Sequence, residues 1–175
     1  MFGFSFLILL NDYLQYLKTD FMSIQKLNIA LNTLESYIER HNVSNIKISK
    51  SAIAWHIDHS LKVINNVIAA VQKSEPDTYK NNFSFLGKVF FAIGYFPRGK
   101  AKAPKHVKPP EVILKEELIS QVALAKANIK TIARLDDNAY FIHPLFGNIN
   151  TPKIYRFLVI HTNHHLKIIN EIIKK

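Results

Sequence analysis

The sequence predicts an all-α protein, a four-helix bundle with a long crossover between its second and third helices. Apolar residues make up 48% of the 175-residue chain, and in four segments they recur at the three- and four-residue spacing of one helical face. No segment shows the alternation of apolar and polar residues that is typical of a half-buried strand, and no repeat is visible. A chain of this length fits one domain.

The first two predicted helices are rich in aliphatic residues. We expect the first from about Ser23 to Arg40, and the second from Ser49 or Ser51, both suitable N-caps, to about Lys73. The second helix is so apolar that neighbouring elements should cover more than one of its sides.

A long connection over residues 74–110 joins the second helix to the third. Its aromatic-rich middle, residues 83–96, predicts a short helix packed across the bundle, and the Pro/Gly/Lys-rich remainder predicts a surface loop. The third helix follows Pro110 and ends at residues 136–138. A loop over residues 143–147 leads to the fourth helix, with Thr151 as the expected N-cap and Pro152 as the first helical residue.

Residues 1–21 are predicted to be an N-terminal extension of a domain that spans residues 22–175. The apolar run from Phe2 to Leu10 is shorter than the about 20 residues of a membrane span, and it lacks the basic start and cleavage site of a signal peptide. Because Met22 precedes Ser23, a good helix cap, our hypothesis is that the extension is an upstream translation of the true start. Without cysteines or a membrane span, the protein is expected in the cytoplasm.

The formal net charge of +10 raises the question of a polyanionic partner. Much of the excess lies between Lys88 and Lys108, a stretch without acidic residues that also contains Arg98, Lys100, Lys102 and Lys105. No RNA-recognition motif, zinc finger or recognition helix accompanies it, so we expect no nucleic-acid partner. The stretch is interpreted as a solvated basic loop.

Two histidines interrupt the aliphatic stripe of the last predicted helix. The residues on its inward face are Ile154, Leu158, His161, His165, Ile168 and Ile172. An unpaired buried polar group costs about 1–3 kcal/mol, so two imidazoles one turn apart need partners. A divalent metal ion suits two neutral imidazoles at this spacing, and the pair therefore predicts a metal site.

The second predicted helix adds His56 and His59, of which His59 shares a face with Val63 and other aliphatic residues. Histidines that face each other from two helices can hold an ion inside a bundle, and three imidazoles leave positions open for water or substrate. His164 lies about 100° around the helix from His165, so we expect it beside the ion rather than on it. Spacing alone leaves open whether His56 replaces His59 as the ligand.

Three motifs carry a resemblance to a known family: Trp55-His-Ile-Asp-His59, His143-Pro-Leu-Phe-Gly147 and His161-Thr-Asn-His-His165. Over about residues 22–175 the chain resembles the DinB/YfiT-like superfamily of metal-dependent bacterial proteins, and most closely its uncharacterised branch with a histidine-proline-x-phenylalanine-glycine loop. The resemblance implies a four-helix bundle with His59, His161 and His165 as ligands of nickel, zinc or a similar ion. It also implies pairing into a homodimer.

Known activities in that superfamily are those of amidase-like hydrolases and thiol transferases. We therefore predict a divalent-metal-binding protein, a metal-dependent hydrolase or thiol transferase acting on a small molecule. His143 and His164 are the candidate catalytic residues for proton transfer or substrate orientation, although His143 could instead hold its loop through a hydrogen bond. The alternative function is that of a non-catalytic binding or scaffold protein whose basic loop contacts a polyanion.

Overall fold

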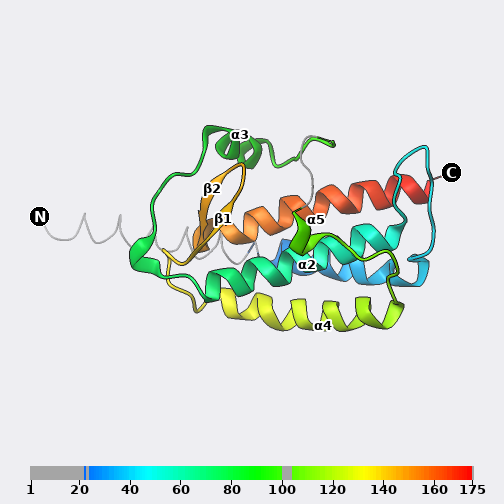
Figure 1. Ribbon diagram of the computed structural model, residues 1–175, viewed down its shortest axis with the longest axis horizontal. Coiled ribbons are helices and arrows are strands. Elements are labelled where there is room, and N and C mark those ends of the chain that lie inside the picture. The colour runs from blue at the N-terminus through cyan, green and yellow to red at the C-terminus, as the bar shows by residue number, and fades with distance from the viewer. Residues whose placement is uncertain (1–21, 23, 100–103, 175) are drawn as a thin grey trace, which may run out of the picture.

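The computed structural model describes residues 22, 24–99 and 104–174, and within them the chain is mainly helical (Figure 1). A helix over residues 24–36 is followed by the 3-10 turn η1 (Ile38–Arg40) and the long helix α2 (Ile53–Gln72). The next connection holds η2 (Pro76–Thr78), the short helix α3 (Phe85–Ile93) and η3 (Lys105–Val107). After these come α4 (Lys115–Ile132), a hairpin of β1 (Tyr140–His143) and β2 (Gly147–Asn150), and the last helix α5 (Thr151–Ile173).

Helix α2 is the centre of the packing, because it contacts both α4 and α5 along its length. The helix over residues 24–36 is tied to α4 by the Glu35–Lys126 ion pair, and Tyr37, just beyond its end, donates a hydrogen bond to Asn170 of α5. Aliphatic side chains from all of these helices form one core. The long helices therefore enclose a common interior, into which side chains of α2 and α5 project.

The expectation that neighbours cover α2 on more than one side is confirmed. Ile57, Leu61 and Ile64 are completely buried, and Val63 and Val67, on another part of the helix circumference, are also buried. Polar residues on this helix are consequently enclosed as well, and they include His56, Asp58 and His59. A buried polar group needs a partner, so each of these side chains points to a specific interaction.

The predicted helical class and the short helix within residues 83–96 are confirmed, whereas the predicted caps of two long helices are wrong. The N-cap of α2 is Ala52, not Ser49 or Ser51, and the first amides of the helix donate instead to the backbone carbonyls of His41 and Val43. The preceding loop supplies these acceptors, so no side-chain cap is needed. The N-cap of α5 is Asn150, one residue before the expected Thr151.

The expectation of a chain without strands is wrong at the loop over residues 143–147, which is the turn of a β-hairpin. Strands β1 and β2 pair antiparallel, with Tyr140 opposite Asn150 and His143 opposite Gly147. Gly147 has a φ of +75°, and a Cβ at this position would lie 2.6 Å from the backbone oxygen of Asn82. The hairpin therefore requires glycine here, both for the positive φ and for the close approach of the neighbouring backbone.

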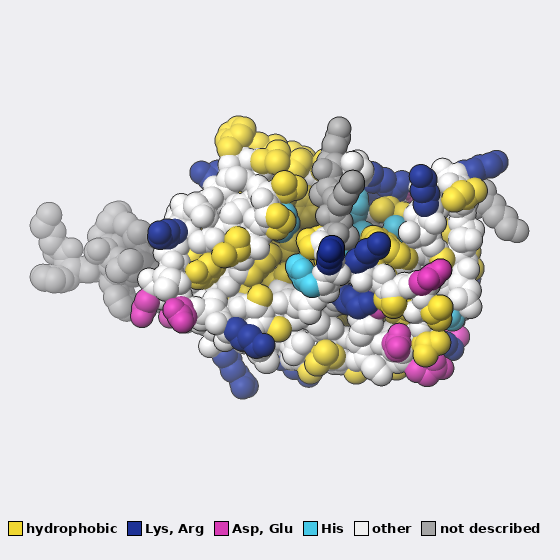
Figure 2. Space-filling model, in the orientation of Figure 1, with side chains coloured by type: hydrophobic (Ala, Val, Ile, Leu, Met, Phe, Trp, Pro, Cys, Tyr) yellow, Lys and Arg dark blue, Asp and Glu magenta, His cyan; other side chains and the backbone are white. Residues whose placement is uncertain are grey.

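Helix α3 lies beyond the tip of the hairpin, on one side of the long helices (Figure 1). Ser84 caps it by accepting a hydrogen bond from the Gly87 amide, and it also binds the hairpin through the carbonyls of Leu145 and Phe146. The outer face of α3 leaves apolar side chains exposed, visible as a yellow cluster in Figure 2. Among the described helices, none is both long enough and apolar enough to cross a bilayer.

Candidate metal centre

Helices α2 and α5 bring three histidines together inside the protein. His59 projects from α2, while His161 and His165 project from successive turns of α5, and one ring nitrogen of each lies within 4.8 Å of the others. The rings of His161 and His165 have a centroid separation of 4.8 Å, and that of His59 lies 4.9 Å from His165. The predicted convergence of these histidines is thus confirmed, and the group can hold a metal ion.

Burial keeps these three rings neutral at physiological pH. His59 and His165 are buried, and His161 retains some exposed surface although its Nδ1 atom is buried. Desolvation lowers the pKa of His59, although the hydrogen bond to Val107 and the charge of Asp58 partly oppose it. Desolvation also holds the pKa of His161 and His165 well below the ordinary value of 6.5, with repulsion by neighbouring imidazolium forms as a smaller cause. A neutral imidazole is the form that binds a metal, so the environment favours the ligand state of all three side chains.

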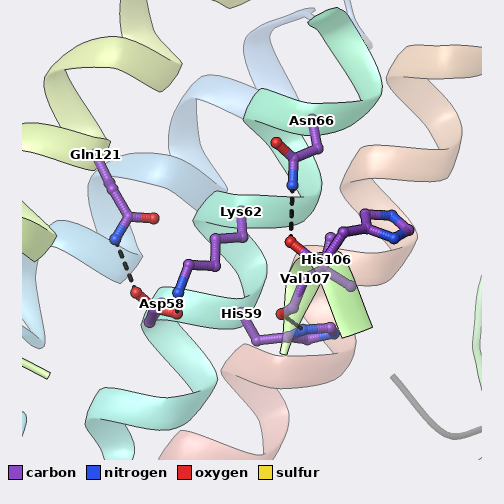
Figure 3. A network of polar contacts seen from close by, with 7 residues as sticks. All are labelled: Asp58, His59, Lys62, Asn66, His106, Val107 and Gln121. Carbon is purple, nitrogen blue, oxygen red and sulfur yellow. Dashed lines mark hydrogen bonds and ion pairs between the residues drawn. The ribbon is translucent and has the colours of Figure 1, made fainter. Parts of the chain in front are cut away.

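The His59 ring is held in place by backbone outside its own helix. Its Nδ1 donates a hydrogen bond of 2.8 Å to the carbonyl oxygen of Val107 in η3, a contact visible in Figure 3. The indole of Trp55 stacks on the same ring, with centroids 5.0 Å apart and an interplanar angle of 23°. Since a carbonyl can only accept, Nδ1 carries the proton, and Nε2 is left with a free lone pair.

The His165 ring has a side-chain partner instead. Its Nδ1 lies 3.1 Å from Nδ1 of His56, and Nε2 of His56 lies 3.0 Å from the hydroxyl of Ser49. His56 is therefore outside the group of three histidines, and both of its ring nitrogens are engaged by protein atoms. The sequence motif left two candidate ligands on α2, and the fold separates them. His59 faces His161 and His165, whereas His56 lies behind His165.

His161 differs from the other two because its buried Nδ1 has no hydrogen-bond partner among the described residues. An unsatisfied nitrogen of this kind costs about 1–3 kcal/mol. The shortfall is removed if an ion binds Nδ1 itself, or if an ion binds Nε2 and a water molecule accepts from Nδ1. The orphaned nitrogen and the two anchored neighbours fit a metal ion better than they fit a purely structural core.

The two candidate catalytic histidines lie near this group with different anchors. His164 donates from Nδ1 to the carbonyl of Phe96 at 2.8 Å, and its ring meets His165 edge to face with centroids 5.0 Å apart. A backbone carbonyl therefore orients the His164 ring. Burial lowers its pKa, an effect that the bond to Phe96 partly offsets.

His143 lies at the end of β1, where it closes the hairpin turn. Its Nδ1 accepts hydrogen bonds of 3.2 Å from the amides of Leu145 and Phe146, and its ring stacks on Phe146 at a centroid distance of 4.2 Å. Two amide donors fix Nδ1 as the unprotonated nitrogen, so the neutral ring carries its proton on Nε2. This geometry supports the loop-holding alternative, and in this tautomer the free Nε2 can donate a proton but cannot accept one.

Sequence reasoning missed the backbone acceptor of His59 and the aromatic side chains around the centre. Trp55 also lines an open groove of about 670 Å³ together with Ser51, Lys108 and Glu111, so one aromatic ring links that groove to the histidine group. On the other side, Phe157 lies 6.0 Å from the His161 ring. Trp55 stood in the motif on α2, but nothing in its spacing indicated that it would stack on His59.

The basic stretch is only partly described by the structure. Lys105, the first residue of η3, and Lys108, which follows it, are exposed, and Arg98 forms an ion pair with Glu171. Lys100 and Lys102 lie outside the described residues, as do residues 1–21 and the proposed cap Ser23. The polyanion partner of this loop stays a prediction.

The sequence matches no protein-family model, and comparisons with curated proteins and with solved structures find no significant similarity.

The metal-free protein is expected to lose stability as the pH falls below 6.5. Folding lowers the pKa of His56 and of His143 from 6.5 to about 4, with burial as the main cause. Between these values the unfolded chain binds more protons than the folded one, so each group lowers the free energy of unfolding by about 1 kcal/mol per pH unit as the pH falls. Well above pH 6.5, by about pH 7.5, both states are almost fully neutral at these positions and the contribution is constant.

Urea unfolding at pH 7.5, 6 and 5 measures this slope. His143→Gln should make it shallower, whereas substitution of the exposed His106 serves as the control and should leave it unchanged. A free energy of unfolding that stays constant between pH 7.5 and 5 would contradict the assignment of buried neutral histidines.

Proposed function

We propose that this chain is a divalent-metal-binding protein of the DinB/YfiT-like four-helix-bundle type, and that His59, His161 and His165 are its ligands. The ion we expect is zinc or nickel. With an ion bound, the centre would act as a hydrolase or a thiol transferase on a small molecule. The observation that carries the proposal is the convergence of three neutral imidazoles from two helices, with donor nitrogens within 4.8 Å of one another.

The donor set supports this choice of ion. Imidazole nitrogen suits zinc and nickel, whereas magnesium and calcium prefer oxygen ligands. Nitrogens bound at about 2.0–2.1 Å to a tetrahedral ion are about 3.4 Å apart, so the rings need to approach one another by at most about 1.4 Å. The chain has no cysteine, so its own side chains offer no competing thiolate.

Three protein ligands leave coordination positions for water or substrate, which is typical of catalytic rather than structural zinc sites. An ion bound there would lower the pKa of a coordinated water or thiol and so supply a nucleophile near neutral pH. The protein's own part is positioning: Val107 fixes the His59 ring, and Phe96 fixes His164 beside the centre. The aromatic rings of Trp55 and Phe157 pack against the rings of His59 and His161 and help to hold them in place.

Metal analysis of protein purified without a histidine tag tests the proposal. Wild-type protein should retain close to one equivalent of a transition metal after dialysis, and the triple His59, His161, His165 to alanine variant should retain almost none. A double His41, His106 to alanine variant controls for loose binding, because His106 is exposed and His41 bonds to the carbonyl of Ile38. Equal metal content in the wild type and the triple variant would refute the proposed centre.

A further inference from the structure

We infer that His56 is a positioning residue, which together with Ser49 forms an outer hydrogen-bond chain that sets His165 as an Nε2 ligand. The inference rests on the proposed function, since it assumes that His165 binds an ion. It goes beyond the ligand set, because it assigns a role to a histidine that spacing alone left as a rival ligand. The juxtaposition that carries it is the series Ser49 Oγ, His56 Nε2, His56 Nδ1 and His165 Nδ1, with contacts of 3.0 and 3.1 Å.

The positions of the protons decide which group donates and which accepts in this series of hydrogen bonds. At 3.1 Å, one of the two Nδ1 atoms must carry a proton and the other must accept it. If His165 binds an ion through Nε2, its own proton lies on Nδ1, so His56 accepts at Nδ1. The neutral His56 ring then carries its proton on Nε2 and donates it to Ser49, 3.0 Å away.

The same atoms can also form both hydrogen bonds with the donor and acceptor roles reversed. If His56 carries its proton on Nδ1 and donates to His165, the Ser49 hydroxyl donates to His56 Nε2, and the proton of His165 lies on Nε2. That nitrogen is then no longer a ligand. Ion binding at His165 therefore selects one of two directions, and the hydroxyl of Ser49 can act as donor or acceptor as required.

This arrangement distinguishes His165 from His59. The partner of His59 is a backbone carbonyl, which only accepts, so its tautomer is fixed with or without an ion. The partner of His165 is an imidazole that can accept or donate. His56 is itself only 4% exposed and Ser49 is half-buried, so few water molecules can replace either group. We conclude that His56 supplies the acceptor that His165 needs in its ligand form.

Two substitutions at one position test the role. His56→Leu removes the acceptor, and His56→Asn keeps an acceptor oxygen near the position of Nδ1. Loss of an outer hydrogen-bond partner typically weakens metal binding by about 10–100-fold, so zinc affinity, measured by competition with a chromophoric chelator, should fall by that factor in His56→Leu. In His56→Asn most of the affinity should return. His41→Leu is the control and should bind zinc as the wild type does.

The absorption spectrum of the cobalt-substituted protein gives a second measurement, because it reports the geometry of the ligands. The bands should change in His56→Leu and return toward the wild-type spectrum in His56→Asn. Identical affinity and spectra in the wild type and His56→Leu would overturn the inference while leaving the metal site intact. Wild-type protein that binds no metal would instead refute the proposed function.

A measurement on the wild type covers the case in which a variant fails to fold. In the zinc-loaded protein, ¹⁵N chemical shifts should show the proton of His56 on Nε2 and that of His165 on Nδ1. The reverse assignment, or a zinc-bound nitrogen on His56, would overturn the inference without any substitution.

Discussion

Replacement of His161 by leucine is expected to abolish metal binding and, at the same time, to stabilise the metal-free protein. Nδ1 of His161 is buried without a partner among the described residues, so removing the ring removes an unsatisfied polar group. Leucine has a similar volume and fits the aliphatic stripe between Leu158 and His165. We expect the free energy of unfolding of the metal-free protein to rise by about 1–2 kcal/mol.

The effect on metal binding should be larger. Loss of a ligand removes a coordinate bond and should weaken binding by more than the about 10–100-fold that an outer partner contributes. Excess metal should therefore stabilise the wild type, by about 4 kcal/mol at a concentration of 1,000 times Kd, and should leave His161→Leu unchanged. Thermal unfolding with and without zinc measures both effects in one series.

His164 provides the matched control, since it lies on the same helix but its Nδ1 is already bonded to Phe96. His164→Leu leaves that carbonyl without its partner, so it should lower the stability of the metal-free protein while zinc still raises it. If both leucine variants change stability in the same direction, the orphaned nitrogen is not the cause.

Helical periodicity could predict that the candidate histidines face inward, whereas the choice of His59 over His56 came from the family resemblance. His161 and His165 occupy positions of an aliphatic stripe, so any compact packing of α5 turns them inward. His59 follows the same rule on α2, whose sides are nearly all covered. The side of a helix on which a residue lies depends on local spacing, so it can be predicted from the sequence.

The partners of these rings could not be predicted, because each comes from a distant segment. Val107 is 48 residues from His59, and its carbonyl has the same chemistry as every other backbone carbonyl. Ser49 offered a better cap than Ala52, yet its hydroxyl bonds to His56, since loop carbonyls already satisfy the first amides of α2. Such choices depend on the path of the loop, which composition does not determine.

The hairpin was hidden for a different reason. Each strand has only four residues, too few for alternation to stand out, and the turn motif could be read as a loop before a helix. The signal that could have revealed it is Gly147 after a short turn, flanked by the β-favouring run from Tyr140 to Ile142. The family resemblance drew attention to His143 of this motif. The structure shows that Gly147 is also required, because of its positive φ and its close approach to the backbone of Asn82.

Replacement of Asp58 by alanine is expected to cost about 3 kcal/mol in the free energy of unfolding. Asp58 is 1% exposed and links α2 to α4: Oδ1 accepts a hydrogen bond of 2.8 Å from Gln121, and Oδ2 lies 2.6 Å from the ammonium of Lys62 (Figure 3). Among the described residues no hydrogen bond reaches Oδ2, so the ion pair with Lys62 is its partner. The Asp58 side chain points toward Gln121 and Lys62, away from His59 (Figure 3).

The size of the effect follows from burial. Removing one partner of a buried pair leaves the other charge without compensation, which costs about 3–5 kcal/mol, and Lys62, with 27% of its side chain exposed, recovers part of this by reaching water. The Lys115–Glu39 pair has nearly the same length, 2.7 Å, but Glu39 is 75% exposed. Glu39→Ala should therefore cost less than about 1 kcal/mol. Equal losses in the two variants would show that burial does not control the strength of these pairs.

Asp58→Asn separates this network from the metal centre, although Asp58 adjoins His59 in the sequence. The amide can still accept from Gln121 but loses the attraction to Lys62, so we expect an intermediate loss of stability. Zinc affinity should stay within about 3-fold of the wild type, because the anchor of His59 is the Val107 carbonyl. A large loss of affinity with this variant would mean that the carboxylate, rather than the backbone, controls the His59 ring.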